Sequence, residues 1–209
     1  MGNDAALLKD VEAYYSGRVR EFGATARGVD WNSNESQQLR FDQLAKVWSA
    51  DTGVVSVLDY GCGYGALADY LRAAGRPMRY QGYDVSADMI SKAASRAGPD
   101  CSFTAIAEEL HPADYVVASG IFNVRLGHSA DAWAAYMQRT IAAMKVLSRK
   151  GFAFNALTSY SDRDRQRADL YYADPLHWFD HCKRAHSSHV ALLHDYPLYE
   201  FTIIARLAT

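Results

Sequence analysis

Short apolar runs alternate with helical patterns along most of the chain, and this alternation limits the fold more than any other feature. Five runs are rich in β-branched or aromatic residues, as buried strands are. They lie at residues 56–61, 79–85, 101–107, 115–122 and 151–157, and helical patterns lie among them at 66–74, 87–97 and 130–147. Strand–helix–strand units need right-handed crossovers. We therefore expect an α/β fold, a doubly wound parallel sheet with helices on both faces.

The end of the chain departs from this pattern. Two further strand-like runs, 189–197 and 199–207, are separated by a single residue. Strands this close must pair antiparallel, because a parallel pair needs a long crossover. The sequence therefore predicts five parallel strands followed by a C-terminal antiparallel hairpin.

Two helices, 5–22 and 35–50, are predicted ahead of the first strand, with Asn34 as the N-cap of the second. A chain of 209 residues is expected to form one domain. Within it, residues 1–50 would form a helical cap and residues 51–209 a sheet core, with an insertion at 158–188.

The stretch VLDYGCGYGALADYL, residues 57–71, carries most of the functional information. Its glycines lie between a predicted strand and a predicted helix, where backbone N–H groups and the positive helix end face a ligand. Residues 61–66, GCGYGA, also satisfy the dinucleotide-binding pattern G-x-G-x-x-A. The loop alone therefore does not identify the ligand.

Two carboxylates and the hairpin favour a ligand other than a dinucleotide. Asp59 precedes Gly61 by two residues, where it would repel a pyrophosphate but suits a cationic amino acid. Asp84 closes the second strand, nineteen residues after Gly65, where an acid accepts hydrogen bonds from ribose hydroxyls. The hairpin adds an antiparallel strand to an otherwise parallel sheet.

In combination, DYGCGYG at 59–65, Asp84, the acidic pair at 108–109 and the hairpin strand at 199–207 resemble class I S-adenosylmethionine-dependent methyltransferases. The resemblance covers about residues 50–209. The stretches GVDWNSNESQQLRF and YYADPLHWFDHCKR are similar to one bacterial subgroup of that class. The resemblance implies a Rossmann-like seven-stranded sheet of order 3-2-1-4-5-7-6. It also implies S-adenosyl-L-methionine as cofactor and S-adenosyl-L-homocysteine as product.

The resemblance implies roles for individual residues. Asp59 faces the methionine ammonium, and Asp84 binds the ribose diol. Tyr15 would cover the methionine end, because the first helix often closes over that site in the family. Trp31 lies in a polar loop, where it would cover the sulfonium or the substrate. Both could instead be packing residues. The other cofactor residues are Tyr60, Gly61, Cys62 and Gly63 under the methionine and ribose, Val85, Met89, Ala107 and Glu108 around the adenine, and Ser119, Gly120, Ile121, Phe122 and Asn123 beside the sulfonium and methyl.

Histidines supply one candidate for catalysis and none for a metal. His128 follows the fourth strand, in a loop at the carboxyl ends of the strands, and is the candidate base. The dense group at 177–189 lacks an accompanying carboxylate or Cys-x-x-Cys motif, so we expect solvated histidines and no metal site. A base is needed only for a weakly nucleophilic acceptor, which leaves O-, N- and S-methylation open.

Charge and composition limit the classes of molecule that the protein is expected to bind. A net charge of −2 offers no basic face for nucleic acid, and no run of 18 apolar residues predicts a membrane span. Three widely spaced cysteines and a polar N-terminus indicate a reducing cytoplasm. We expect a small-molecule acceptor, with the oligomeric state open. The alternatives are a nicotinamide-dependent oxidoreductase and a non-catalytic protein that binds S-adenosylmethionine.

Overall fold

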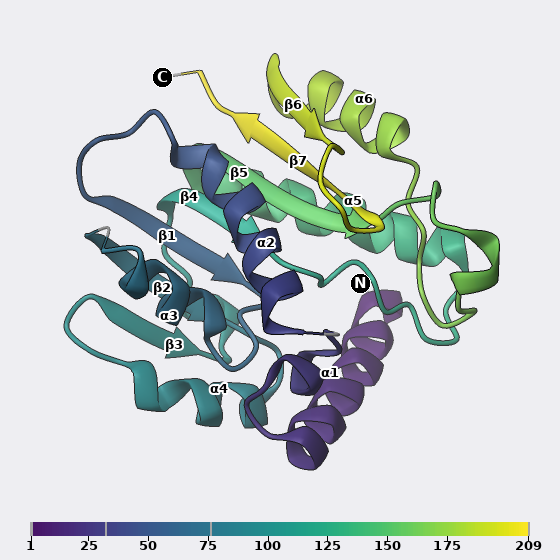
Figure 1. The fold of residues 1–209 in the computed structure, drawn as a ribbon, viewed down its shortest axis with the longest axis horizontal. Helices are drawn as coiled ribbons and strands as arrows, with labels where there is room; N and C mark the ends of the chain where they lie inside the picture. The colour runs from purple at the N-terminus through teal and green to yellow at the C-terminus, as the bar shows by residue number, and fades with distance from the viewer. Residues whose placement is uncertain (1, 32, 76, 209) are drawn as a thin grey trace.

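The computed structural model describes residues 2–31, 33–75 and 77–208. Its centre is a seven-stranded sheet of order β3-β2-β1-β4-β5-β7-β6 (Figure 1). This order and the pairing directions confirm the expected doubly wound α/β fold. The strands are β1 Val55–Tyr60, β2 Met78–Tyr83, β3 Cys101–Thr104, β4 Ala113–Ala118, β5 Ser148–Leu157, β6 His189–Leu193 and β7 Glu200–Arg206.

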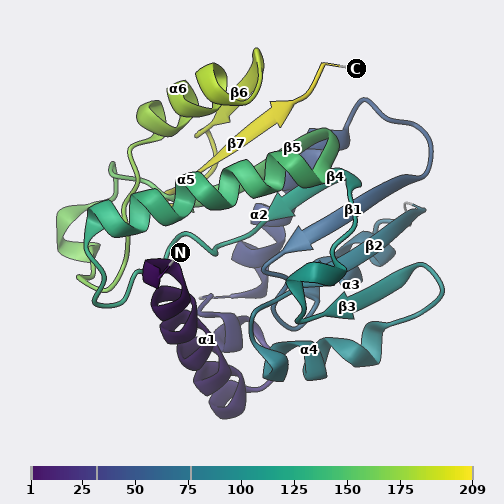
Figure 2. The same cartoon turned by 180° about the vertical axis from the view of Figure 1, so that it is seen from behind.

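Alternate residues of the central strands face opposite layers, as the period of a β-strand requires. Leu58 of β1 and Phe152 of β5 belong to a buried cluster with Trp133 and Met137 of α5 (Ala130–Leu147). The neighbouring positions, including Val57, belong to a second cluster with α2 (Asn34–Ala45) and α3 (Ala66–Ala73). Helices therefore cover both faces, α2 and α3 in front in Figure 1 and α5 in front in Figure 2.

The C-terminal hairpin is antiparallel, as predicted. β7 lies between β5 and β6 and pairs antiparallel with both of them. The connection from β5 to β6 contains the 3₁₀ turn Arg163–Arg165 (η5) and the helix α6, Pro175–Ala185. The side chain of Asp174 caps the start of α6 by accepting hydrogen bonds from the N–H groups of Leu176 and His177.

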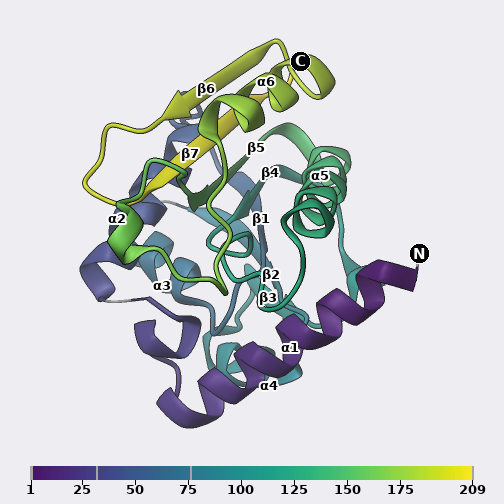
Figure 3. The same cartoon turned by 90° about the vertical axis from the view of Figure 1, so that its right-hand side faces the viewer.

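The N-terminal segment passes along one end of the sheet. Helix α1, Gly2–Phe22, lies beside α4, Ala87–Ala93, and Ser16 and Ser86 share a hydrogen bond of 2.8 Å (Figure 3). A 3₁₀ turn, Ala26–Val29 (η1), then leads to α2 on the front face. Because this segment crosses the carboxyl ends of the strands, it covers the place where open α/β sheets bind ligands.

Two N-terminal predictions are wrong in detail. The N-cap of α2 is Ser33, whose hydroxyl accepts a hydrogen bond from Ser36 N, so Asn34 is the first helical residue. The helix predicted over 35–50 ends at Ala45 and continues as a 3₁₀ turn, Lys46–Trp48 (η2). None of the described helices is long and apolar enough to cross a membrane.

The third and fourth strands are shorter than predicted. β3 ends at Thr104 and is followed by the three-residue turn η4, Ala107–Glu109, so no α-helix lies between β3 and β4. β4 ends at Ala118, where the chain turns through Gly120 in the left-handed region, at φ 77°. The residues predicted at these strand ends therefore lie in turns.

Candidate functional site

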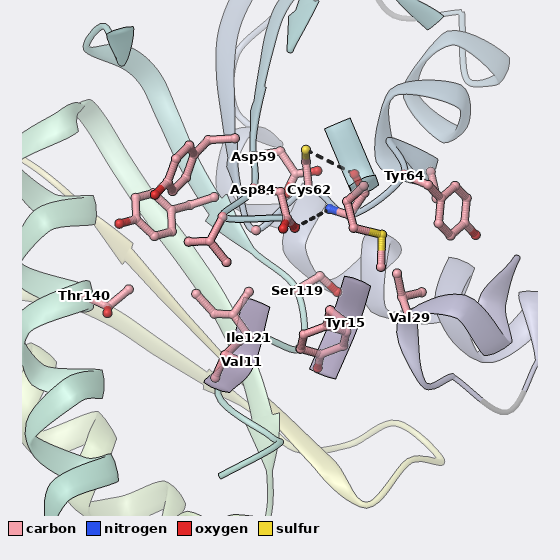
Figure 4. Close-up of a pocket in the computed structure, with 18 of the residues that line it drawn as sticks. Val11, Tyr15, Val29, Asp59, Cys62, Tyr64, Asp84, Ser119, Ile121 and Thr140 are labelled. Carbon is pink, nitrogen blue, oxygen red and sulfur yellow. Dashed lines mark hydrogen bonds between the residues drawn. The ribbon is translucent and has the colours of Figure 1, made fainter. Parts of the chain in front are cut away.

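A cavity of about 250 Å³ lies at the carboxyl ends of β1, β2 and β4, between the sheet and the N-terminal segment. Figure 4 shows Val11, Tyr15 and Val29 of that segment facing Asp59, Asp84 and Ser119 across it. The sheet, α1, the η1–α2 segment and α5 all contribute to its walls.

The glycine loop forms the floor of the cavity. The N–H groups of Gly61 and Cys62 both donate to the carbonyl of Tyr83, at 2.7 and 2.8 Å, which ties the loop to the end of β2. Gly61 has φ 86°, and a Cβ there would lie 2.1 Å from the side chain of Ile121. Only glycine satisfies both this conformation and this close approach.

Asp59 is the buried carboxylate of the cavity, with 2% exposure. The hydroxyl of Tyr80 donates to it at 2.6 Å. Burial raises the pKa of Asp59 to about 7, with a further contribution from Asp84, while the Tyr80 hydrogen bond opposes the rise. A carboxylate with so little solvation is stabilised by a cation, so this position favours a positively charged group.

Asp84 is held at the end of β2 by two backbone donors. Gly63 N donates to one carboxylate oxygen and Ser86 N to the other, both at 2.9 Å. Burial raises the pKa of Asp84 to about 6, and these two hydrogen bonds oppose the rise. Each oxygen keeps a further lone pair, so the carboxylate is fixed in place and can still accept hydrogen bonds from a ligand.

Tyrosines line the end of the cavity that lies next to α5. The rings of Tyr60 and Tyr83 are 5.0 Å apart, and Tyr136 and Thr140 face the same space from α5. Burial raises the pKa of Tyr15, Tyr60, Tyr83 and Tyr136. These phenols are therefore protonated near neutral pH and offer O–H donors, not bases.

Most of the residues predicted for the site line this cavity. They are Tyr15, Trp31, Asp59, Tyr60, Gly61, Cys62, Gly63, Asp84, Val85, Met89, Ser119, Gly120 and Ile121. They come from segments far apart in the sequence, and the parallel sheet brings them together because its strands end at one edge.

Five of the predicted positions lie outside the lining. Ala107 and Glu108 sit in the exposed turn η4. Asn123 is buried, and its side-chain oxygen accepts from Leu157 N at 3.0 Å, which ties the turn after β4 to the end of β5. His128 Nε2 lies 3.1 Å from an Asp10 carboxylate oxygen on α1.

The fifth position, Phe122, has structural contacts of its own, and so do the histidines for which no metal site was expected. Phe122 is fully buried, and its carbonyl accepts from Trp133 Nε1 at 2.8 Å. In the histidine-rich stretch, the rings of His177 and His181 pack edge-on against Trp178, at 5.3 and 5.6 Å between centroids.

Sequence patterns did not identify the lining residues that helices contribute, nor four others. They are Leu8 and Val11 of α1, Gln37 and Phe41 of α2, and Tyr136, Arg139, Thr140 and Ala143 of α5, together with Val29, Tyr64, Ala66 and Tyr83. Their spacings of three and four residues mark one face of each helix. That periodicity was visible in the sequence, but it does not tell a ligand-lining face from a core face.

Comparison with known proteins identifies the family to which the chain belongs. Residues 57–150 match the family model described as a methyltransferase domain. A Mycobacterium tuberculosis protein named "Putative methyltransferase Rv1506c" is 53% identical over 156 residues, which cover 74% of this chain and 94% of that protein.

Solved structures show the same fold. The magnesium protoporphyrin IX methyltransferase of Synechocystis PCC 6803, with S-adenosylhomocysteine bound, has a TM-score of 0.68 at 15% identity, over 96% of this chain and 99% of that one. The N-methyltransferase NodS of Bradyrhizobium japonicum WM9, also with S-adenosylhomocysteine, has a TM-score of 0.61 at 15% identity, over 85% and 90%. The family model and the 53% identical relative show that the chain belongs to the methyltransferase family.

Proposed function

We propose that this methyltransferase acts on a small-molecule acceptor. The observation that carries the proposal is the cover over the cavity: α1 and the segment from η1 to α2 cover its outer side with Val11, Tyr15, Val29, Trp31 and Phe41. An acceptor must fit beneath this cover, which suits a small organic molecule better than a folded macromolecule. The name of the Synechocystis relative gives magnesium protoporphyrin IX, a small molecule, as its substrate.

The lining residues fit the methyl donor from one end of the cavity to the other. Asp59 would pair with the methionine ammonium, and the loop Gly61–Gly63 would lie beneath the methionine and ribose. Gln37 accepts a hydrogen bond from the Tyr64 hydroxyl at 3.0 Å, so its amide N–H₂ is available as a donor to the methionine carboxylate. Asp84 would accept hydrogen bonds from the ribose hydroxyls.

The adenine would lie in the tyrosine-lined end of the cavity, whereas Met89 packs with Val29 and Tyr64 beside the glycine loop. Val85 and Ile121 offer apolar contacts on the path from Asp84 to this end. Because Ala107 and Glu108 lie outside the lining, we propose that the hydroxyls of Tyr136 and Thr140 contact the base in their place.

Bound S-adenosylmethionine supplies a methyl group activated by a positively charged sulfur. The protein then has to align the acceptor with that methyl and exclude water. The described lining holds no histidine or lysine, and its tyrosines are protonated. We propose that catalysis rests on alignment, with His128 outside the reacting centre. Ser119 and Gly120, at the end of β4, would border the methyl.

We propose a cytoplasmic setting for the enzyme. Cys62, Cys101 and Cys182 are all free thiols, and Cys62 and Cys182 are buried. Free thiols are typical of proteins kept in a reducing compartment.

The test is calorimetric titration of the purified protein with S-adenosylhomocysteine, with NAD as control, followed by turnover assays on a panel of small phenols, amines, thiols and carboxylic acids. Micromolar binding of S-adenosylhomocysteine and methylation of one class would support the proposal. Binding without turnover on any class would favour a non-catalytic protein, and binding of NAD would favour an oxidoreductase.

A further inference from the structure

Trp31 lies directly on the backbone of the turn that follows β4. A Cβ placed on Gly120 would be 2.3 Å from Cζ2 and 2.4 Å from Cη2 of the indole. Asn155, which is fully buried on β5, accepts a hydrogen bond from Gly120 N at 2.8 Å and so fixes this turn. The indole therefore rests on a rigid part of the sheet beside Ser119.

Arg40 packs on the ring of the same tryptophan. Its guanidinium carbon lies 3.8 Å from the centroid of the Trp31 ring. Two parallel hydrogen bonds hold the guanidinium to Glu200, from Nε at 2.8 Å and from Nη2 at 2.7 Å. A third, from Nη1 at 2.7 Å, reaches the carbonyl of Ser36. All guanidinium nitrogens are thus in use, and the plane of the group is fixed.

The ion pair is buried, and it joins distant parts of the chain. Arg40 is 7% exposed on α2, and Glu200 is 1% exposed at the start of β7, where it pairs with Leu157 of β5. A buried ion pair of this kind costs desolvation and often adds no net stability over apolar residues of similar volume. Stability alone therefore does not account for placing this pair beside the cavity wall.

We propose that Arg40 and Glu200 are positioning residues that hold Trp31 as a fixed wall of the cavity next to Ser119 and Gly120. This inference rests on the proposed function, in which the methyl and the acceptor meet at that wall. Without the pair, the indole would have to be ordered when ligand binds, and the entropy lost in ordering it would weaken binding.

Two variants test the proposal. The double variant Arg40→Leu, Glu200→Leu removes both charges together and leaves no buried charge unpaired. The variant Arg40→Lys keeps the charge opposite Glu200 but loses the flat guanidinium and its paired hydrogen bonds. The control is Arg184→Ala with Asp180→Ala, which removes an exposed ion pair on α6, away from the cavity.

Acrylamide quenching of tryptophan fluorescence reports directly on Trp31. Of the four tryptophans, Trp48, Trp133 and Trp178 are at most 2% exposed, so acrylamide quenches mainly the fluorescence of Trp31. Subtracting the signal of a Trp31→Phe protein isolates it. We expect both test variants to be quenched more than wild type and to bind S-adenosylhomocysteine about two- to tenfold more weakly, while the control matches wild type.

Unchanged quenching and unchanged affinity in both variants would overturn the proposal and make the pair purely structural, even if the melting temperature falls. If the double variant does not fold, Arg40→Lys decides alone. Failure of wild type to bind S-adenosylhomocysteine would instead contradict the proposed cofactor placement, so the two failures are distinguishable.

Discussion

The pKa of Asp59 predicts a pH dependence of cofactor binding. In the proposed placement the ligand ammonium would pair with the ionised carboxylate, so binding would displace a proton wherever Asp59 is protonated in the free protein. With a pKa of about 7, about nine-tenths of the carboxyl is ionised at pH 8 and about one-tenth at pH 6. We therefore expect affinity for S-adenosylhomocysteine to fall about tenfold between pH 8 and pH 6.

Asp59→Asn should remove this dependence. The amide still accepts the Tyr80 hydrogen bond but carries no charge, so affinity at pH 8 should fall by about 1.5–3 kcal/mol, roughly ten- to a hundredfold. The pH profile between 6 and 8 should flatten, while Asp84, with a pKa of about 6, adds its own effect at lower pH.

Calorimetric titration at pH 6, 7 and 8, in two buffers with different ionisation enthalpies, measures both the affinity and the protons released. Asp180→Asn, an exposed change on α6, is the matched control and should keep the wild-type slope. A flat profile in wild type would refute the reasoning. So would a slope that survives in Asp59→Asn.

Three further outcomes follow from the same geometry. Unfolded Asp has a pKa of about 4, so between about pH 4 and pH 7 the folded protein holds a proton on Asp59 that the unfolded chain releases, and stability falls as pH rises. Asp59→Asn should therefore raise the free energy of unfolding at pH 8 by about 1–3 kcal/mol, and thermal denaturation showing no gain would contradict this. Gly120→Ala places a Cβ 2.3 Å from the Trp31 ring on a residue whose φ is 77°. Denaturant titration should therefore show a free energy of unfolding lower by about 1–3 kcal/mol, and calorimetry should show a weaker affinity for S-adenosylhomocysteine. Tyr136→Phe should weaken S-adenosylhomocysteine binding about two- to tenfold, the effect of losing one neutral hydrogen bond, whereas Glu108→Gln should leave the affinity unchanged. A loss of affinity in Glu108→Gln but not in Tyr136→Phe would instead place the adenine at η4.

The fold was largely predictable because its signals are local and strong. The pattern over 130–147 reproduces α5 residue for residue, and the near-adjacent runs at the C-terminus could pair only as a hairpin. The errors lie where local signals are ambiguous. The apolar character of 101–107 continues past Thr104, where the strand ends and its hydroxyl accepts from Ile106 N at 3.0 Å.

The lining of the cavity was predictable where it depends on strand ends. Gly61, Asp59 and Asp84 line the cavity because parallel strands deliver their carboxyl ends to one edge. Following a strand end closely in the sequence did not by itself place a residue in the cavity lining. Asn123 and His128 both follow β4, yet one is directed to Leu157 N and the other to Asp10.

The sequence by itself determined the strand–helix alternation, the C-terminal hairpin, the glycine loop and the two carboxylates, because hydrophobic period, turn chemistry and strand-end position are properties of short segments. Only the tertiary structure decided how the cavity is closed. The helix faces of α1, α2 and α5 become walls through docking, and the contact between Arg40 and Glu200 joins residues 160 positions apart. Such a contact forms only when the helix layer packs on the sheet, so no pattern in a short segment of the sequence predicts it.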